Sequence, residues 1–170
     1  GGVGNYAKLL ADVLKKNGIK SKFLIPDYLD NKNKNQTLFG KKNPNLISLL
    51  EKTNSKEVIL HFSGYGYASR GLCFNLIKSL ESWKQNDNSR KLITIFHEIY
   101  ASGPIYRTSF WTLLPQKYLA KTLLKISDVA LVTTKQNKLT LSSFDKKKQI
   151  IYSNVFSNIG ELKKNRKLKK

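Results

Sequence analysis

Short apolar runs that alternate with helical patterns constrain the fold of this chain more than any other feature. Residues 58–60, 92–96 and 129–132 read Val-Ile-Leu, Leu-Ile-Thr-Ile-Phe and Val-Ala-Leu-Val. Runs of this length and apolarity are typical of strands that are covered on both faces. Segments with apolar residues at helical spacing separate them. The alternation predicts βαβ units and therefore a parallel sheet of the α/β class.

The same patterns predict the order of the elements along the chain. We expect a helix over residues 5–17 with Gly18 as its C-cap, because Gly readily adopts the left-handed conformation that ends a helix. An Asn/Lys-rich loop is expected over residues 30–45. Further helices are expected at 46–52, after Gly71, at 109–126 and at 135–144, and strands at 21–25, 57–62, 91–96, 129–132 and 149–152.

The Gly-rich start of the chain fits a Rossmann-like, doubly wound sheet whose first strand is missing. In such sheets the Gly-rich turn joins the first, central strand to the first helix, whereas no residue precedes Gly1 and the chain contains no methionine. We therefore expect a fragment, with a Rossmann-like domain over residues 1–157. Residues 158–170 would be an interdomain linker or the start of a second domain.

The chain is strongly basic. Lys and Arg number 31 against 11 Asp and Glu, giving a formal net charge of +20. By itself this excess suggests nucleic acid, an anionic membrane surface or an anionic substrate as a partner. The lysines are spread over predicted helix faces and turns, however, which favours an ordinary solvated surface over a dedicated polyanion site. Phosphate and base-edge recognition favours the planar guanidinium of arginine, and we do not expect nucleic acid as the partner. Only four of these cationic residues are arginine: Arg70, Arg90, Arg107 and Arg166.

Cysteine content and motifs exclude several chemistries. Cys73 is the only cysteine, so an internal disulfide and a cysteine-based zinc site are excluded. The sequence contains no P-loop, no His-Glu-x-x-His and no Asp-x-Asp, and we expect neither a metal nor a resident cofactor. No apolar run approaches the ~20 residues that span a bilayer. We expect a cytoplasmic protein, soluble or peripheral at the inner face of the membrane, with Cys73, Trp83 and Trp111 in its core or in an interface.

Two segments place polar side chains at the ends of predicted strands. His97 and Glu98 follow the strand at 91–96 directly, and the sequence His61-Phe62-Ser63-Gly64-Tyr65-Gly66-Tyr67 follows the preceding one. In open parallel sheets, ligands bind outside the carboxyl ends of the strands. A histidine there can donate to a sugar hydroxyl or a phosphate. The tyrosines are either a stacking surface for an acceptor or loop anchors.

The chain resembles the acceptor-side domain of family 4 GT-B glycosyltransferases. The resemblance rests on Gly1-Gly2-Val3-Gly4-Asn5-Tyr6 at the first helix, on LHFSGYGYASRG at 60–71, on FHEIYASGP at 96–104 and on VFSNIGE at 155–161. Glycines at a helix N-terminus let an anion approach the unpaired amides. The resemblance implies that Gly1 and Gly2 approach the diphosphate of a nucleotide-sugar donor. It also implies that His97 is a catalytic residue near the donor sugar.

The resemblance also implies which half of the whole enzyme binds the acceptor and which binds the donor. The N-terminal half would hold a polysaccharide or lipid-linked glycan acceptor, with Asn5, Tyr65, Tyr67 and Glu98 as the expected acceptor-binding residues. The nucleotide sugar, a co-substrate, would be held by a C-terminal domain that carries a Glu-x7-Glu motif. That motif is absent from this sequence. Hexosyl transfer with retention and without a metal is implied for the full-length enzyme, and this fragment alone is expected to be inactive.

Two other interpretations stay open. The charge allows a lysine-rich polyanion or nucleic-acid binding α/β module, which a steep salt dependence of binding would reveal. A nicotinamide-dependent Rossmann protein is the second. It is disfavoured because Ala7 stands where the dinucleotide fingerprint has its third glycine, and because no acidic residue ends the predicted strand at 21–25.

Overall fold

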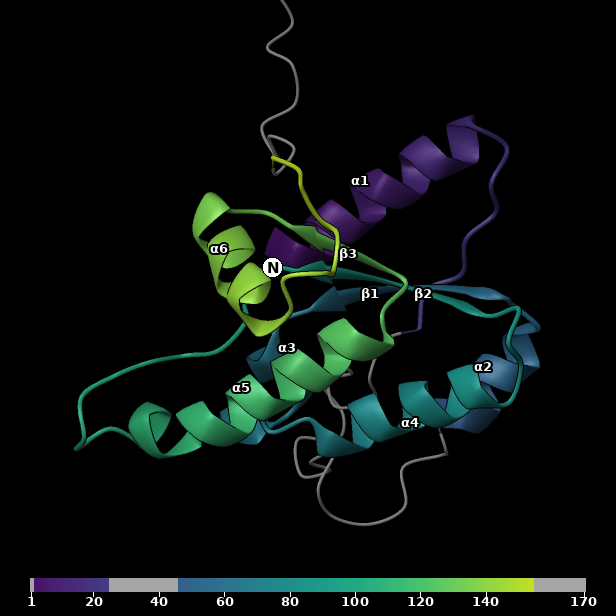
Figure 1. Cartoon of the computed structure of the whole chain (residues 1–170). Coiled ribbons are helices and arrows are strands. Elements are labelled where there is room, and N and C mark those ends of the chain that lie inside the picture. The colour runs from purple at the N-terminus through teal and green to yellow at the C-terminus, as the bar shows by residue number, and fades with distance from the viewer. Residues whose placement is uncertain (1, 25–45, 155–170) are drawn as a thin grey trace, which may run out of the picture. The chain divides into compact units, whose positions relative to one another are not determined.

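The computed structural model describes residues 2–24 and 46–154, and the chain divides into two compact units. Residues 1–21 with 154–170 form the first unit, and residues 22–153 form the second. The described helix of the first unit is α1 (Gly2–Lys16) (Figure 1). The predicted loop at 30–45 and the segment VFSNIGE lie outside the described residues.

Helix α1 ends where the sequence predicts. Gly18 has φ +79°, its N–H donates to the carbonyl of Lys15 at 3.0 Å, and the N–H of Ile19 donates to that of Leu14 at 2.9 Å. These two bonds form a Schellman motif around the left-handed glycine. The start of α1 differs from the prediction, because the helix begins at Gly2. Gly2 and Gly4 therefore belong to its first turn instead of preceding it.

The strand predicted at residues 21–25 is wrong for its described part. Residues 21–24 have no regular structure and are exposed. A strand needs a hydrogen-bonded neighbour, and the sheet in this structure starts at Glu57. The apolar side chains of Phe23 and Leu24 are 51% and 40% exposed, so burial does not hold this segment extended against a partner.

The second unit contains the parallel sheet that the apolar runs predict. Its strands are β1 (Glu57–Phe62), β2 (Lys91–Phe96), β3 (Val129–Val132) and β4 (Ile150–Tyr152). They are all parallel, and their spatial order is β1-β2-β3-β4. The last residues of the four strands pair in one row, Phe62 with Phe96, Phe96 with Val132 and Val132 with Tyr152. Their carboxyl ends are therefore level at one edge.

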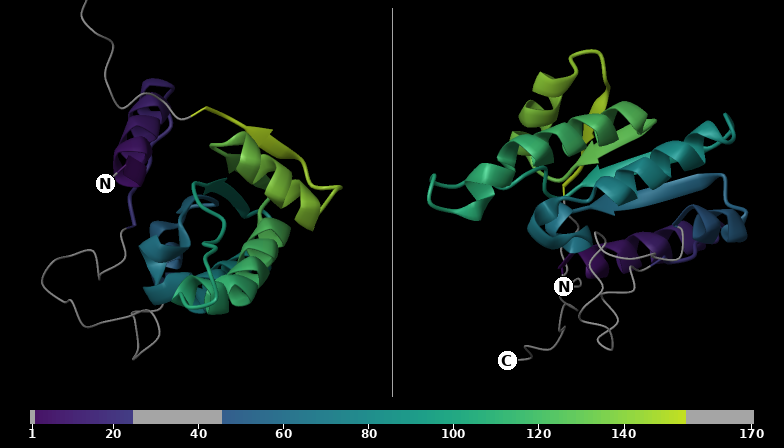
Figure 2. Two further views of the ribbon diagram at one scale, coloured as in Figure 1. Left: turned by 90° about the vertical axis from the view of Figure 1, so that its left-hand side faces the viewer. Right: turned by 90° about the horizontal axis from the view of Figure 1, so that it is seen from below.

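Helices join the strands, as predicted. They are α2 (Leu46–Thr53), a single turn α3 (Gly64–Tyr67) with the 3-10 turn η2 (Ser69–Gly71), α4 (Phe74–Gln85), α5 (Thr108–Ile126) and α6 (Lys135–Phe144). Crossovers between parallel strands are right-handed, so a sequential strand order puts α4, α5 and α6 on one face. Seen from below, these helices lie in front of the strands (Figure 2, right). Helices on both faces, as in a doubly wound sheet, remain a prediction.

The core lies between the sheet and these three helices. Along β1 and β2, Leu60, Phe62, Leu92 and Phe96 point into it, and they pack among apolar side chains of α4 and α5. Trp83 is fully buried, which confirms its predicted place in the core. The remaining large members of this core are Leu50, Leu76, Ile77, Leu80, Ile99, Leu119, Leu123, Leu124, Val132, Leu141 and Ile150.

Two further predictions about apolar residues are only partly right. Cys73 is buried, as predicted, but it precedes α4 instead of lying within the helix. Burial raises the pKa of its thiol to about 11, so it is protonated at neutral pH and is not a nucleophile. Trp111 is 70% exposed, so it does not lie in the core, and its other predicted place, an interface, stays a prediction. It occupies the outer side of α5, opposite the residues that face the sheet.

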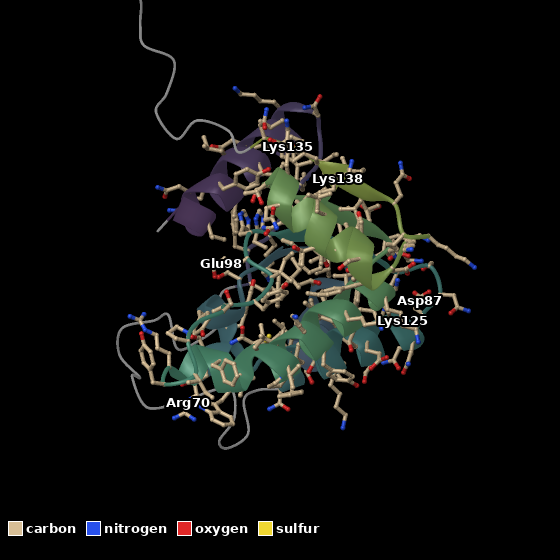
Figure 3. All side chains as sticks on the ribbon, turned by 60° about the vertical axis from the view of Figure 1, so that its left-hand side comes forward. Arg70, Asp87, Glu98, Lys125, Lys135 and Lys138 are labelled. Atoms are coloured by element: carbon tan, nitrogen blue, oxygen red, sulfur yellow. The ribbon has the colours of Figure 1, made fainter. Side chains whose placement is uncertain are left out.

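The two ends of the sheet differ in their polar groups. At the amino end, Asp128 accepts hydrogen bonds from Lys84 Nζ and from the N–H of Leu92, both at 2.7 Å. Figure 3 shows Asp87 and Lys125 at that end and Glu98 and Arg70 at the opposite, carboxyl end. No helix among the described residues is long and apolar enough to cross a membrane.

Candidate functional site

Two histidines meet at the carboxyl edge of the sheet. His61 is the penultimate residue of β1, and His97 directly follows β2. Neighbours in a strand point to opposite faces. Because Phe62 and Phe96 point into the core, both histidines lie on the face away from α4, α5 and α6. Their Nδ1 and Nε2 atoms are 3.2 Å apart, and their rings are stacked with centroids 5.5 Å apart and 16° between the planes.

The histidine pair is held neutral. Burial, with a smaller contribution from the ring of His97, lowers the pKa of His61 to about 4. Burial also lowers the pKa of His97, although the nearby carboxylate of Glu98 acts in the opposite direction. In a neutral imidazole one ring nitrogen donates and the other accepts. One ring of the pair therefore donates its N–H to the other ring, and the two tautomers are linked.

Backbone contacts fix the position of both rings. The N–H of His97 donates to the carbonyl of Phe62 at 2.9 Å, which extends the sheet pairing by one residue. Asn137 Nδ2 in α6 donates to the carbonyl of His97 at 3.2 Å. The Tyr67 hydroxyl donates to the carbonyl of His61 at 3.0 Å. Of the two roles considered for Tyr67, the structure shows the loop anchor.

A small cavity lies between the strand ends and the first half of α5, and neither His61 nor His97 lines it. Its volume is about 220 Å³. Ser63 Oγ donates to Glu98 Oε2 at 2.6 Å, which links the loops that follow β1 and β2. Tyr65 is 48% exposed at this site. The lining residues are Phe62, Gly64, Tyr65, Gly71, Glu98, Ile99, Tyr100, Ala101 and Gln116.

Gln116 organises the wall of this cavity. Its side chain is buried, with 3% of the residue exposed. The Oε1 atom accepts from the N–H of Ala101 at 2.8 Å, and Nε2 donates to the carbonyl of Arg70 at 2.7 Å. Weaker contacts join Nε2 to Thr112 Oγ1 at 3.1 Å and to the Tyr65 hydroxyl at 3.4 Å. One amide thus ties α5 to the loops that follow both β1 and β2.

Sequence reasoning missed Gln116, although a signal was present. Thr112, Gln116, Leu119 and Leu123 recur at helical spacing on the buried side of α5. A glutamine at an inward position of an apolar stripe must find hydrogen-bond partners. Such a residue is a candidate for binding or for bridging loops, and here it bridges loops.

The structure brings four of the seven predicted site residues together. His97, Glu98, Tyr65 and Tyr67 all lie at the carboxyl ends of β1 and β2. Gly2 and Asn5 are in α1, which belongs to the other compact unit, and Gly1 lies outside the described residues. Their predicted roles at a donor phosphate and an acceptor are not tested here.

The surroundings of the site carry exposed positive charge. Helix α6 begins at Lys135, and Thr134 caps it by accepting from the N–H of Asn137 at 3.1 Å. Lys135 and Lys138 in its first turn are exposed, and Figure 3 shows both on α6. Within residues 2–24 and 46–154, no three His, Cys, Asp or Glu side chains come together as a metal site would require.

Comparison with known proteins gives no match: no protein-family model, no curated protein and no solved structure is significantly similar to the chain. The fold and the grouping of side chains at the carboxyl edge are therefore the observations that bear on function. That edge combines a neutral histidine pair, a carboxylate and an exposed tyrosine.

Proposed function

We propose that the chain is the acceptor-side, Rossmann-like half of a GT-B glycosyltransferase of the family 4 type. The observation that carries the proposal is the neutral pair His61–His97 at the carboxyl ends of parallel strands, the edge that also holds Glu98 and a small cavity. This is where ligands bind in open α/β sheets. The motifs LHFSGYGYASRG and FHEIYASGP, on which the resemblance to this family rests, supply those same residues.

The chemistry of these groups suits a sugar. Glu98 can accept a hydrogen bond from a hydroxyl, and the ring of Tyr65 offers an apolar face for stacking against a pyranose. In this proposal His97 donates a hydrogen bond to the sugar being transferred, and the bond strengthens as charge develops in the transition state. His61 sets the tautomer that His97 uses, so His61 is a positioning residue.

The donor side of the reaction is assigned to another domain. The Glu-x7-Glu motif that the family uses to hold the nucleotide sugar is absent from these 170 residues. We therefore expect this chain to bind an acceptor glycan without transferring sugar to it. Its contribution to catalysis would be to present the acceptor and the imidazole of His97 to a donor bound opposite.

Binding of glycans to the purified chain tests the proposal. In two-dimensional NMR titrations with a panel of oligosaccharides, an acceptor should shift the amide signals of Tyr65, Glu98 and Ala101. Glu98→Gln should weaken that binding about tenfold, the scale of one hydrogen bond to a charged group. The exposed Gln136→Ala on α6 serves as the matched control.

Three outcomes would count against the proposal. One is the absence of any glycan whose binding perturbs this edge. Another is sugar transfer by the chain alone from any nucleotide sugar, since it would place the donor site within these residues. The third is tight RNA or heparin binding with a steep salt dependence and no glycan binding, which would favour the polyanion-binding interpretation.

A further inference from the structure

The outer face of α5 is apolar where a surface helix is usually polar. Its exposed residues Trp111, Leu114, Tyr118, Lys121 and Lys125 recur at intervals of three and four and form one stripe. The stripe lies opposite the buried residues of the same helix. The first three of these side chains are 70%, 75% and 63% exposed.

The turn before α5 extends this apolar surface. Ile105 and Tyr106 are 62% and 82% exposed, and Phe110 is 40% exposed. Trp111 Nε1 donates to the carbonyl of Ile105 at 3.1 Å, and the rings of Phe110 and Trp111 meet edge to face at 5.5 Å. The turn is thus fastened to the helix. We name as the α5 patch the six side chains of Ile105, Tyr106, Phe110, Trp111, Leu114 and Tyr118.

The charged residues in the chain segment that carries the α5 patch have one sign. Between Glu98 and Asp128 the sequence contains no acidic residue. Arg107 is exposed beside the patch, and Lys121 and Lys125 continue the stripe toward the end of α5. An exposed apolar patch of this kind marks a site of interaction with another protein or with a membrane. The cations favour a negatively charged partner surface.

We propose that the α5 patch docks this unit onto the surface of an anionic lipid bilayer. Trp and Tyr are the residues that concentrate at the membrane interface, where one end of the ring is wet and the other is apolar. A helix with an apolar face beside lysines lies in the plane of that interface. Tyr106, Trp111, Leu114 and Tyr118 enter the headgroup region, and Lys121 and Lys125 contact the lipid phosphates.

This inference does not depend on the proposed sugar chemistry. The patch lies on the outer side of α5, and Gln116, on the buried side of the same helix, lines the cavity. In Figure 1 the turn before α5 and the first turns of that helix extend beyond the sheet. Docking through this patch holds the unit at the membrane surface without passing any helix through it.

Binding to vesicles tests the docking surface, and tryptophan fluorescence reports on it directly. Trp83 is fully buried and Trp111 is 70% exposed, so a change in emission on binding comes from Trp111. With vesicles of phosphatidylcholine and phosphatidylglycerol, the emission of the chain should shift to shorter wavelength. With phosphatidylcholine alone the chain should stay in the supernatant, and added salt should weaken the binding to anionic vesicles.

Substitutions distinguish the contribution of the apolar side chains to vesicle binding from that of the lysines. Leu114→Ser should reduce partition onto anionic vesicles about tenfold, the value of burying one large apolar side chain. The double change Lys121→Gln and Lys125→Gln should reduce it about twenty-five-fold, from about fivefold for each lysine. Matched controls lie on other elements: Leu139→Ser, at a residue 67% exposed, and Lys146→Gln with Lys147→Gln should leave partition unchanged.

Three results would each overturn the proposal. Equal partition onto neutral and anionic vesicles would remove the role of the lysines. Unchanged partition of the Leu114→Ser chain, with circular dichroism showing that it is folded, would place docking elsewhere. A chain that binds no vesicles but sediments as a dimer, and becomes monomeric on Leu114→Ser, would show that a second copy covers the patch.

Discussion

His61 Nδ1 and His97 Nε2 lie 3.2 Å apart, so each imidazole determines which nitrogen of the other carries a proton. A ligand that accepts a hydrogen bond from one ring therefore fixes the tautomer of both. The coupling makes the pair respond as a unit. Even so, loss of the ring that contacts a substrate should have a larger effect than loss of its neighbour, which acts only through the tautomer.

The first prediction concerns catalysis in the natural protein that carries this sequence. His97→Ala should lower kcat by roughly a hundredfold, because a hydrogen bond that strengthens in the transition state is lost. His61→Ala should cost less, since it only frees the tautomer of His97. Steady-state kinetics of both variants would distinguish them. A normal kcat for His97→Ala with a large loss for His61→Ala would reverse the assignment.

The second prediction concerns stability and pH. The pKa of His61 is about 4 when folded against an ordinary value of 6.5, so between these values the unfolded chain binds more protons. The free energy of unfolding should therefore fall as the pH drops through this range. Because the ring is only partly buried, we expect a loss of about 1–2 kcal/mol. Urea unfolding across this range would measure it.

His61→Gln provides the control for the pH effect. It removes the titrating ring, so the slope of stability against pH between 4 and 6.5 should become shallower. In the folded His97→Gln chain, the pKa of His61, followed by NMR, should move toward 6.5, because one of its two lowering influences is gone. An unchanged slope and an unchanged pKa would show that the two rings are not coupled.

The third prediction concerns the amide that ties the loops together. Gln116→Leu keeps the apolar bulk but leaves the Ala101 N–H and the Arg70 carbonyl without their bonds to the side chain. We expect it to destabilise the fold by about 1–3 kcal/mol and to speed amide exchange at Ala101. Gln136→Leu, at an exposed position of α6, should change neither. Similar stability of both variants would refute the bridging role.

The fourth prediction concerns the glycine beside that amide. Gly71 has φ +70°, and a Cβ atom there would lie 3.0 Å from Gln116 Nε2. Gly71→Ala should cost about 1–3 kcal/mol, from the left-handed backbone and from displacement of the amide. Gly66→Ala is the matched control, since its Cβ would be 3.8 Å from that of Ser63. Thermal unfolding of the two variants gives the comparison.

The strands were predictable because burial on both faces leaves an unbroken apolar run. The runs at 57–62, 91–96 and 129–132 match β1, β2 and β3 residue for residue. The segment at 21–24 shows the limit of this signal, because apolar residues make a strand only where a neighbour supplies hydrogen bonds. The position of His97 at a strand end was predictable because His97 directly follows one of these apolar runs.

The contacts within the site were not predictable from local patterns. The His61–His97 contact joins residues 36 positions apart and depends on the register of β1 against β2. Gln116 acts through loops whose paths the sequence does not reveal. The sequence did not decide between core and interface for Trp111, because the first half of α5 has apolar residues on both its inner and its outer side. Helical periodicity then does not distinguish the face that is buried from the face that is exposed.

The strand order β1-β2-β3-β4 has a consequence for how the protein is made. Each of β2, β3 and β4 pairs with the strand synthesised just before it, and one long helix, α4, α5 or α6, lies in each crossover. Contacts of this kind are comparatively local, which favours rapid folding. As the chain leaves the ribosome, each new strand and its helix can be added to a sheet that already exists. The carboxyl edge that carries His61 and His97 is then assembled before translation reaches β4.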